Sequence, residues 1–502
     1  MKKVLLIGLM SVMLSGCVID INGIIDIMTS SNISNNKTSQ IISGDFKNKG
    51  LTGREYYEYY TSVSGCEYFP SIGNNKMLVV PVMFKGESLN NPDQVIDDLK
   101  IAFSGNEKET GWESVSSYYS ESSYGKLNIE VDVYDSWINI NKTVREVASL
   151  SYDEYEDPSI YVLNYVHEYL KNRIDLTKYD SNSDGFVDGV WLVYGNHSYS
   201  NYSYKSDSIE SLLWAYTYWD VYAKPSLNNP TFNVYCWGSY DFMYEGKSSI
   251  SGLKIDAHTF IHETGHMLGL DDYYDYDSTK NPVGCLDMMD YNIGDHNSYS
   301  KWMLDWVEPK VFDYSEGVME IDSFSNTGEF IMIPSDKNID CSPLSEYLLI
   351  ELYTPTGLNG LDANYSYLNK YPKMFNKIGV RIYHVDSRLG EFVYQSGDWY
   401  YNDYINNYSL EDLYSNTLSY NYYAIFNSNT PSYSFEENNN LIRLVSSYYN
   451  NNYVFDDGKY AENKDLFKDG SSLVNFKFNN GKTLDYKVEF EIIDNKLKVY
   501  FE

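Results

Sequence analysis

Apolar runs and strict alternation mark the first strands that the chain is expected to form. Residues 77–84 form an apolar run typical of a buried strand, and residues 190–194 form another. Residues 126–133 alternate between apolar and polar side chains, which is the period of a half-buried strand. A helix is expected near residues 95–103. Together with a helical motif considered below, these elements predict a domain of the α+β class over residues 71–310.

From about residue 314 the pattern changes to short strands separated by Asn, Gly and Ser. Residues 330–333, 347–350 and 380–383 are clear examples of these runs. We therefore expect a β-rich C-terminal domain over residues 311–502.

The N-terminus has the pattern of a secretory signal peptide over residues 1–16. Two lysines precede an apolar run that is too short to span a bilayer. The run ends in Leu-Ser-Gly-Cys, which resembles the bacterial lipobox and implies lipid attachment at Cys17. Residues 17–70 read as a polar tether or a short pro-segment. We expect a lipoprotein at the bacterial cell surface or outside the cell, held to the membrane only through its lipid.

The net charge limits the classes of partner. Thirty-eight basic and 71 acidic side chains give a formal charge of −33, which repels nucleic-acid phosphates over a Debye length. The sequence therefore predicts no nucleic-acid partner, and we expect a monomer. Beyond Cys17, the cysteines form one or two disulfides or remain as buried thiols, and their spacing does not decide between these alternatives. These cysteines are Cys66, Cys236, Cys285 and Cys341.

The chemistry concentrates in a His-Glu-x-x-His motif at residues 262–266. Residues four apart on a helix lie on one face, so His262 and His266 can bind one metal ion through neutral imidazoles, with Glu263 beside it. This arrangement is typical of zinc hydrolases.

A third ligand is expected where the chain turns back after the helix. Gly269 can end the helix in the left-handed conformation and bring either Asp271 or Asp272 to the same ion. His258 continues the histidine stripe, but its backbone lies about 12 Å along the helix axis from that of His266. That is too far for three rings to meet one ion, so we expect His258 to have a packing or supporting role.

The motif His262-Glu263-x-x-His266-x-x-Gly269-x-x-Asp272, followed by a methionine turn, resembles that of the immune inhibitor A-like secreted metallopeptidases. These are relatives of the metzincins whose third ligand is Asp. The resemblance implies a zinc peptidase and favours Asp272 over Asp271.

Softer matches extend the resemblance to roughly residues 75–490. Residues 286–290 are similar to the family's methionine turn, with Met289 as the turn residue, and residues 299–307 are similar to its following helix. Residues 118–127 and 379–386 also resemble family segments. One departure is Asp305, where the family would have Gly before the Trp. In some metzincins a tyrosine two residues past the turn stabilises an oxyanion, and Tyr291 has that position.

A calcium site is predicted in the loop from Asp180 to Asp188. Oxygen-bearing side chains occupy its first, third, fifth and ninth positions, and Gly185 occupies the sixth. Position twelve is Trp191 instead of the Glu of an EF-hand, so the loop is not a standard EF-hand, and a solvated turn that binds nothing is the alternative. The expected ligands are the side chains of Asp180, Asn182, Asp184 and Asp188 and the backbone carbonyl of Phe186.

Other ionisable residues near these motifs are expected to be structural or solvated. His384 lies in a strand-like run, where a structural role is favoured over a catalytic one. A further group of acids is a candidate for another cation, but a solvated surface is favoured for it: Asp271, Asp275, Asp277 and Asp295.

These observations predict a lipid-anchored, extracellular zinc endopeptidase on an α+β, metzincin-like domain. Its substrates would be proteins or peptides, its cofactors Zn²⁺ and Ca²⁺, and its general base Glu263. Two alternatives stay open: a surface adhesin or glycan-binding lipoprotein on an inactive protease fold, and a zinc amidase acting on peptidoglycan. The presence of Glu263 argues against the adhesin.

Overall fold

The computed structural model describes most of the chain as two compact units. The N-terminal unit contains residues 65–270, and the C-terminal unit contains residues 271–502 with Arg54. The domain boundary expected near residue 310 stays a prediction. Cys17, most of the expected tether, Asp277 and Cys341 lie outside the described residues. The described residues are 54, 65–150, 157–275, 280–337, 343–395, 398–404, 421–425, 440–448 and 452–502.

A mixed sheet forms the centre of the N-terminal unit. Its strands follow the order β2-β1-β5-β8-β6, with β3 beside β1. Neighbouring strands are parallel except β6, which runs antiparallel to β8. The strands predicted at residues 77–84, 126–133 and 190–194 are β1, β2 and β5, so these predictions are confirmed. The bounds are β1 (Gly73–Met83), β2 (Leu127–Val133), β3 (Ile138–Asn139), β5 (Val190–Tyr194), β6 (Tyr216–Trp219) and β8 (Val234–Ser239).

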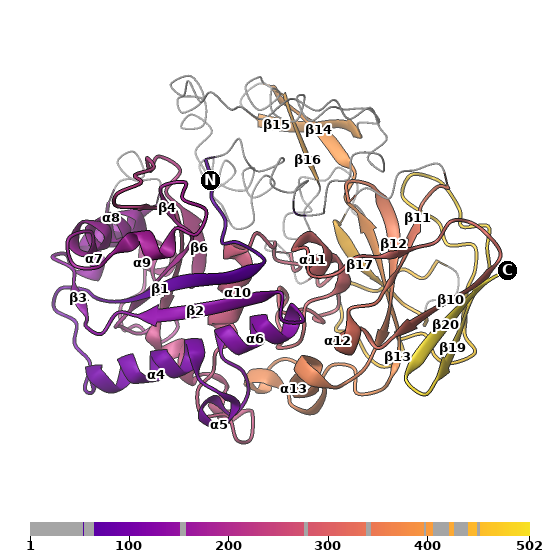
Figure 1. Ribbon diagram of the computed structural model, residues 1–502, viewed down its shortest axis with the longest axis horizontal. Helices are drawn as coiled ribbons and strands as arrows, with labels where there is room; N and C mark the ends of the chain where they lie inside the picture. The colour runs from indigo at the N-terminus through magenta and orange to yellow at the C-terminus, as the bar shows by residue number, and fades with distance from the viewer. Residues whose placement is uncertain are drawn as a thin grey trace. The chain divides into compact units, whose positions relative to one another are not determined.

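Helices cover both faces of this sheet (Figure 1). On one face, Val80 of β1 and Leu192 of β5 share a core cluster with residues of α7, α8 and α9. On the other face, the Trp191 ring contacts Phe103 of α4 and Phe260 of α10. The helix predicted near residues 95–103 is α4. The bounds are α4 (Pro92–Ser104), α6 (Val115–Ser122), α7 (Val144–Ala148), α8 (Pro158–Leu170), α9 (Asp207–Leu212) and α10 (His258–Met267).

The other elements of the N-terminal unit are short. Two of them, β4 and β7, form a separate parallel pair. They are α5 (Glu107–Thr110), β4 (Phe186–Val187), β7 (Thr231–Phe232) and the 3-10 helices η2 (Leu176–Tyr179), η3 (Tyr240–Tyr244) and η4 (Gly246–Ser248).

The described part of the C-terminal unit consists mainly of antiparallel sheets. A five-stranded sheet has the order β17-β13-β12-β11-β9, a four-stranded sheet β10-β20-β19-β18, and a three-stranded sheet β15-β14-β16. The strands predicted at residues 330–333, 347–350 and 380–383 are β11, β12 and β13, so the α+β class holds for the chain. The strands are β9 (Lys310–Val311), β10 (Gly317–Asp322), β11 (Ile331–Pro334), β12 (Glu346–Tyr353), β13 (Gly379–Asp386), β14 (Leu389–Gln395), β15 (Asp398–Tyr404), β16 (Asn421–Ile425), β17 (Ile442–Val445), β18 (Ser472–Leu473), β19 (Val488–Ile493) and β20 (Lys496–Phe501). The helices are α11 (Ser298–Met303), α12 (Phe324–Thr327), α13 (Gly360–Asn364), η5 (Gly357–Asn359) and η6 (Tyr367–Asn369).

Helix α11 lies in the segment at residues 299–307 that resembles the family's helix, and it ends at Met303. The reason is Asp305, which has a φ of +61° in the left-handed region. The amide of Trp306 then donates to the carbonyl of Lys301 (2.8 Å), which closes the helix end. The position where Gly was expected therefore has a conformation that favours Gly.

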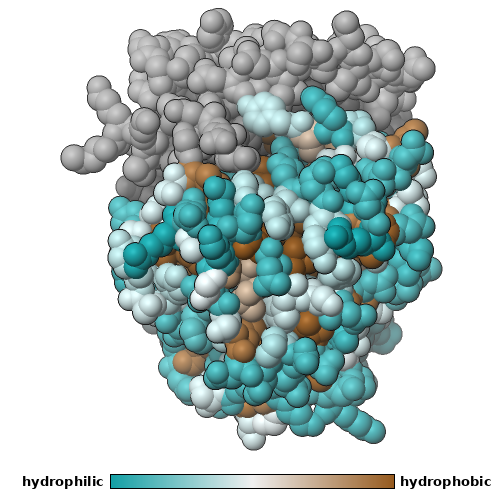
Figure 2. Space-filling view, turned by 90° about the vertical axis from the view of Figure 1, so that its left-hand side faces the viewer, coloured by the Kyte–Doolittle hydropathy of each residue, from teal (hydrophilic) through white to brown (hydrophobic). Residues whose placement is uncertain are grey.

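The surface and the cysteines complete the description of the fold. No helix among the described residues is long and apolar enough to cross a membrane. On the face in Figure 2, hydrophilic side chains predominate, and the exposed hydrophobic side chains form small separate groups.

Cys66, Cys236 and Cys285 are buried, and no disulfide joins any two of them.

Candidate metal centre

Helix α10 carries the motif, and hydrogen bonds from three other segments hold it in the N-terminal unit. The Tyr119 hydroxyl donates to the carbonyl of Ile261 (2.7 Å), and the Trp191 indole donates to the Thr264 hydroxyl (3.1 Å). The amide of Phe69 donates to the carbonyl of Met267 (2.9 Å). These contacts come from α6, from β5 and from the segment before β1, and they hold the middle and the C-terminal end of the helix in the unit.

The end of α10 has the geometry predicted from Gly269. This glycine has a φ of +104°, which is left-handed backbone. Its amide donates to the carbonyl of His266 (2.8 Å), and the amide of Leu270 donates to the carbonyl of Gly265 (3.0 Å). These two bonds define a Schellman motif, which reverses the chain directly after the second histidine.

The reversal brings together the three predicted zinc ligands. His262, His266 and Asp272 each offer one ligand atom, and the three atoms lie within 4.8 Å of one another. Among the described residues this is the one such group of His, Cys, Asp and Glu side chains. Asp271 is not a member. The His258 ring centroid lies 6.3 Å from that of His262, whereas those of His262 and His266 are 4.9 Å apart.

The chemistry of these donors fits a zinc ion. The Nδ1 atom of His266 lies 2.7 Å from the carbonyl oxygen of Leu270. Because a carbonyl only accepts hydrogen bonds, Nδ1 carries the proton and Nε2 keeps its lone pair for a metal. Two imidazoles and one carboxylate are a zinc ligand set of the open, catalytic kind, and a backbone carbonyl is a usual partner for the other ring nitrogen.

Glu263 is almost fully buried, at 6% exposed, and lies against two strands of the sheet. The Thr217 hydroxyl of β6 donates to the carbonyl of Glu263 (2.7 Å) and lies 3.3 Å from its carboxylate Oε2. The Cys236 thiol of β8 contacts both the Thr217 hydroxyl (3.1 Å) and the carbonyl of Glu263 (3.3 Å). Burial raises the pKa of Cys236 well above its usual value, and the charge of Glu263 adds to the rise, so this thiol remains protonated.

The segment predicted as the methionine turn is organised by Asp287, which is fully buried. Its carboxylate accepts from the amides of Met289 (2.8 Å) and Asn297 (2.7 Å), and the His296 ring lies 3.3 Å away. The carbonyl of Met289 accepts from the amide of Tyr273 (2.8 Å), which follows Asp272 directly. The turn is thus hydrogen-bonded to the chain beside the expected third ligand.

Tyr291 is held in a stack of tyrosine rings. Its centroid lies 4.2 Å from that of Tyr274 and 5.5 Å from that of Tyr371, with nearly parallel planes. Burial, followed by the negative charge of Asp290, raises the pKa of Tyr291 above its usual value. Its hydroxyl therefore stays protonated and is a hydrogen-bond donor at neutral pH.

The predicted calcium loop has the expected turn, with Gly185 at a φ of +93°. Its oxygens, however, accept from the loop's own amides: Asp180 from Asp184 (3.1 Å) and Gly185 (3.0 Å), and Asp188 from Ser181. The loop carboxylates are not among the converged ligand atoms described above. Burial, and secondarily the charges of the other two aspartates, raise the pKa of Asp188 to about 6.

The expectation of solvated acids near the motif is wrong for two residues. Asp275 and Asp295 are buried, at 4% and 3% exposed. Asp295 lies 2.6 Å from the ammonium of Lys301, which is itself fully buried. Buried carboxylates of this kind are normally paired, so this pair is structural. His384 also has a structural contact, with Nε2 at 2.8 Å from Glu346.

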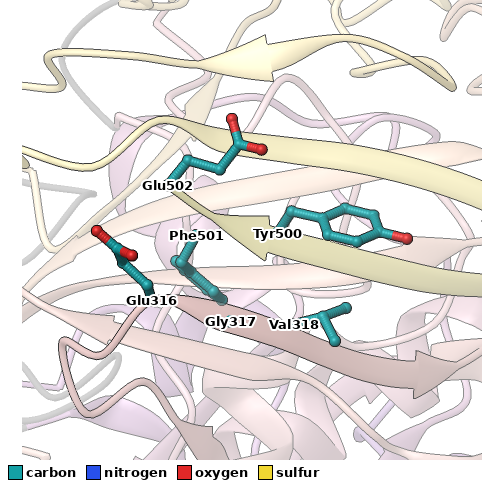
Figure 3. A pocket seen from close by; sticks show the side chains of 6 residues that line it. All are labelled: Glu316, Gly317, Val318, Tyr500, Phe501 and Glu502. Carbon is teal, nitrogen blue, oxygen red and sulfur yellow. The ribbon is translucent and has the colours of Figure 1, made fainter.

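A shallow hollow of about 440 Å³ lies elsewhere, over β10 and β20. The carboxylates of Glu316 and Glu502 lie at one end of these paired strands, with Val318 and Tyr500 further along (Figure 3). None of the residues that line this hollow belongs to the predicted zinc or calcium site.

Comparison with protein-family models and with curated proteins finds no match to this chain. The candidate centre is therefore argued from its own residues. Sequence reasoning missed the contact of Thr217, because it reaches Glu263 from a strand distant in sequence. It also missed the role of Asp287, for which the position two residues before Met289 was the available signal.

Proposed function

We propose that the chain is a zinc-dependent endopeptidase with a metzincin-like catalytic domain. The observation that carries the proposal is the convergence of His262, His266 and Asp272. The carbonyl of Leu270 supports it by leaving Nε2 of His266 available. The family resemblance of the motif supplies the peptide bond as the reacting group.

Each residue of the proposed site has a separate role in the reaction. When bound, zinc supplies Lewis-acid chemistry that brings the pKa of water toward neutrality and polarises a carbonyl. The two histidines and Asp272 would hold the ion. Glu263, which follows the first histidine, takes a proton from the attacking water and passes it to the leaving amine. Tyr291, with its proton retained, is a donor for the negative charge that develops on the carbonyl oxygen.

The proposal also includes the setting of the enzyme. Cys17 carries the lipid, the ectodomain faces the exterior of a bacterial cell, and calcium binds the loop at Asp180–Asp188. The proposals about Cys17 and calcium rest on sequence patterns. The charge of −33 is the reason that we propose no nucleic-acid partner.

The test is digestion of casein and a peptide library by the purified lipoprotein in detergent. We expect hydrolysis that a zinc chelator stops and added zinc restores. Glu263→Gln should keep the zinc while lowering kcat by about 10²–10⁴-fold. Peptidoglycan is tested in parallel: zinc-dependent release of its peptides without casein hydrolysis would replace the proposal with the amidase. A zinc-loaded protein that cleaves neither and binds glycans would support the adhesin.

A further inference from the structure

We infer that Thr217 is a positioning residue for Glu263 and fixes its carboxyl group beside the metal centre. The inference rests on the proposed function, because it concerns the general base of that reaction. Thr217 lies on β6, about 46 positions before Glu263 in sequence, and its side chain is 1% exposed. It therefore acts on the motif from another element of the fold.

Two neighbouring strands present side chains to the same peptide group of α10. Thr217 and Cys236 are directly opposite each other in the antiparallel pair of β6 and β8. Both contact the carbonyl oxygen of Glu263, at 2.7 Å and 3.3 Å. Only the Thr217 hydroxyl also reaches the carboxylate, at 3.3 Å from Oε2. The two side chains also contact each other (3.1 Å), so they share the contact to the carbonyl and differ in the contact to the carboxylate.

The hydrogen-bond donors and acceptors of the Thr217 hydroxyl show what its contact with the carboxylate of Glu263 does. A hydroxyl has one proton and two lone pairs. The Thr217 hydroxyl lies 2.7 Å from the carbonyl oxygen of Glu263 and 3.3 Å from Oε2, so it donates mainly to the carbonyl and more weakly to the carboxylate. Once Glu263 has taken a proton from water, its own O–H can donate to a lone pair of the Thr217 oxygen. The same oxygen therefore accommodates both forms of the base without movement of the side chain.

Threonine suits this position for a physical reason. Its branched Cβ restricts χ1, and the side chain is buried. The hydroxyl is therefore fixed in place, and a carboxyl group held by a fixed partner loses less freedom when the reaction begins. A serine would keep the hydrogen bonds with less restriction, and a valine would keep the shape without them.

The experiment compares three variants of the lipoprotein: Thr217→Val, Thr217→Ser and Cys236→Ala. Five quantities are measured for each: kcat and KM on a casein-derived peptide, bound zinc, the affinity for a peptide hydroxamate, and the melting temperature. Cys236→Ala is the control, because it removes the contacts of the thiol to the carbonyl of Glu263 and to the Thr217 hydroxyl and leaves the carboxylate contact of Thr217 in place.

We expect Thr217→Val to lower kcat about tenfold, with KM, zinc content and melting temperature close to wild type. The hydroxamate, whose hydroxyl hydrogen-bonds to the base, should bind about tenfold more weakly. Thr217→Ser should recover most of both losses, and Cys236→Ala should change kcat less than twofold.

Three results would overturn the inference. One is an unchanged kcat in Thr217→Val. Another is an equal loss of kcat in Cys236→Ala, which would show that the effect passes through the helix backbone. The third is a fall in zinc content or melting temperature that parallels the loss of kcat. Failure of the proposed function is distinct from these, since the wild type itself would then show no chelator-sensitive peptidase activity.

Discussion

The carbonyl oxygen of Leu270 accepts a hydrogen bond from Nδ1 of His266 at 2.7 Å, only four residues further along the chain. The bond exists because the chain reverses at Gly269. The same turn that ends α10 therefore orients the second histidine and delivers Asp272 to it. The helix end, the ring orientation and the third ligand depend on one backbone conformation.

This dependence predicts the effect of Gly269→Ala. A side chain at a φ of +104° costs about 1–2 kcal/mol of stability, and any shift of Leu270 weakens the support of His266. We expect zinc affinity to fall about 10–100-fold, as for loss of a supporting partner. Gly252→Ala is the control, because Gly252 has a φ of +90° with open space around its Cβ position. Equal zinc affinity in the two variants would argue against the coupling.

The convergence of ligands also separates the two neighbouring aspartates. Asp272 belongs to the group whose ligand atoms lie within 4.8 Å, and Asp271 does not. We expect Asp272→Ala to weaken zinc binding by more than about 100-fold, beyond the usual effect of an outer partner. Asp271→Ala should leave it little changed. Metal analysis and competition with a chelator measure both, and the reverse pattern would assign the ligand to Asp271.

The parts that sequence reasoning predicted are local, and the parts that it missed are not. The turn at Gly269 and the strand at residues 190–194 follow from short patterns. The Thr217 contact depends on β6 pairing with β8, which no short pattern specifies. Burial of Asp295 was missed because its partner Lys301 is recognised only after α11 is placed.

The end of α11 shows a different limit. Family resemblance marked Asp305 as the position of an expected Gly, and the structure places it in the left-handed region. Aspartate tolerates this conformation better than most residues, because its short polar side chain can hydrogen-bond locally.

The half-buried carboxyl group of Glu245 in the N-terminal unit makes stability depend on pH. Burial first, and then the charges of Asp241 and Asp256, raise the pKa of Glu245 from 4.5 to about 7. An acid with a raised folded-state pKa stabilises the fold below its unfolded pKa, and this contribution disappears as the pH rises through 7. The loss from this group is roughly 3 kcal/mol at most.

Glu245→Gln tests this expectation, because the amide keeps the shape without the charge. The variant should gain stability relative to wild type as the pH rises from 5 to 8, with the difference growing through the range. Urea unfolding at a series of pH values measures it. A difference that stays constant with pH would mean that Glu245 does not titrate in this range.

The last prediction concerns calcium at the loop from Asp180 to Asp188. Its carboxylates accept from loop amides, and burial first, followed by repulsion from Asp180 and Asp184, raises the pKa of Asp188 to about 6. A divalent cation would relieve this repulsion. It would also stabilise the folded state by about 2.7 kcal/mol at a concentration 100 times its Kd.

We therefore expect millimolar calcium to raise the melting temperature by several degrees. Asp184→Ala should remove this increment while zinc is retained. Ser183→Ala, in the same loop but without a predicted ligand, should keep the increment. If calcium shifts the melting of none of the three proteins, the loop is a turn held by its own hydrogen bonds.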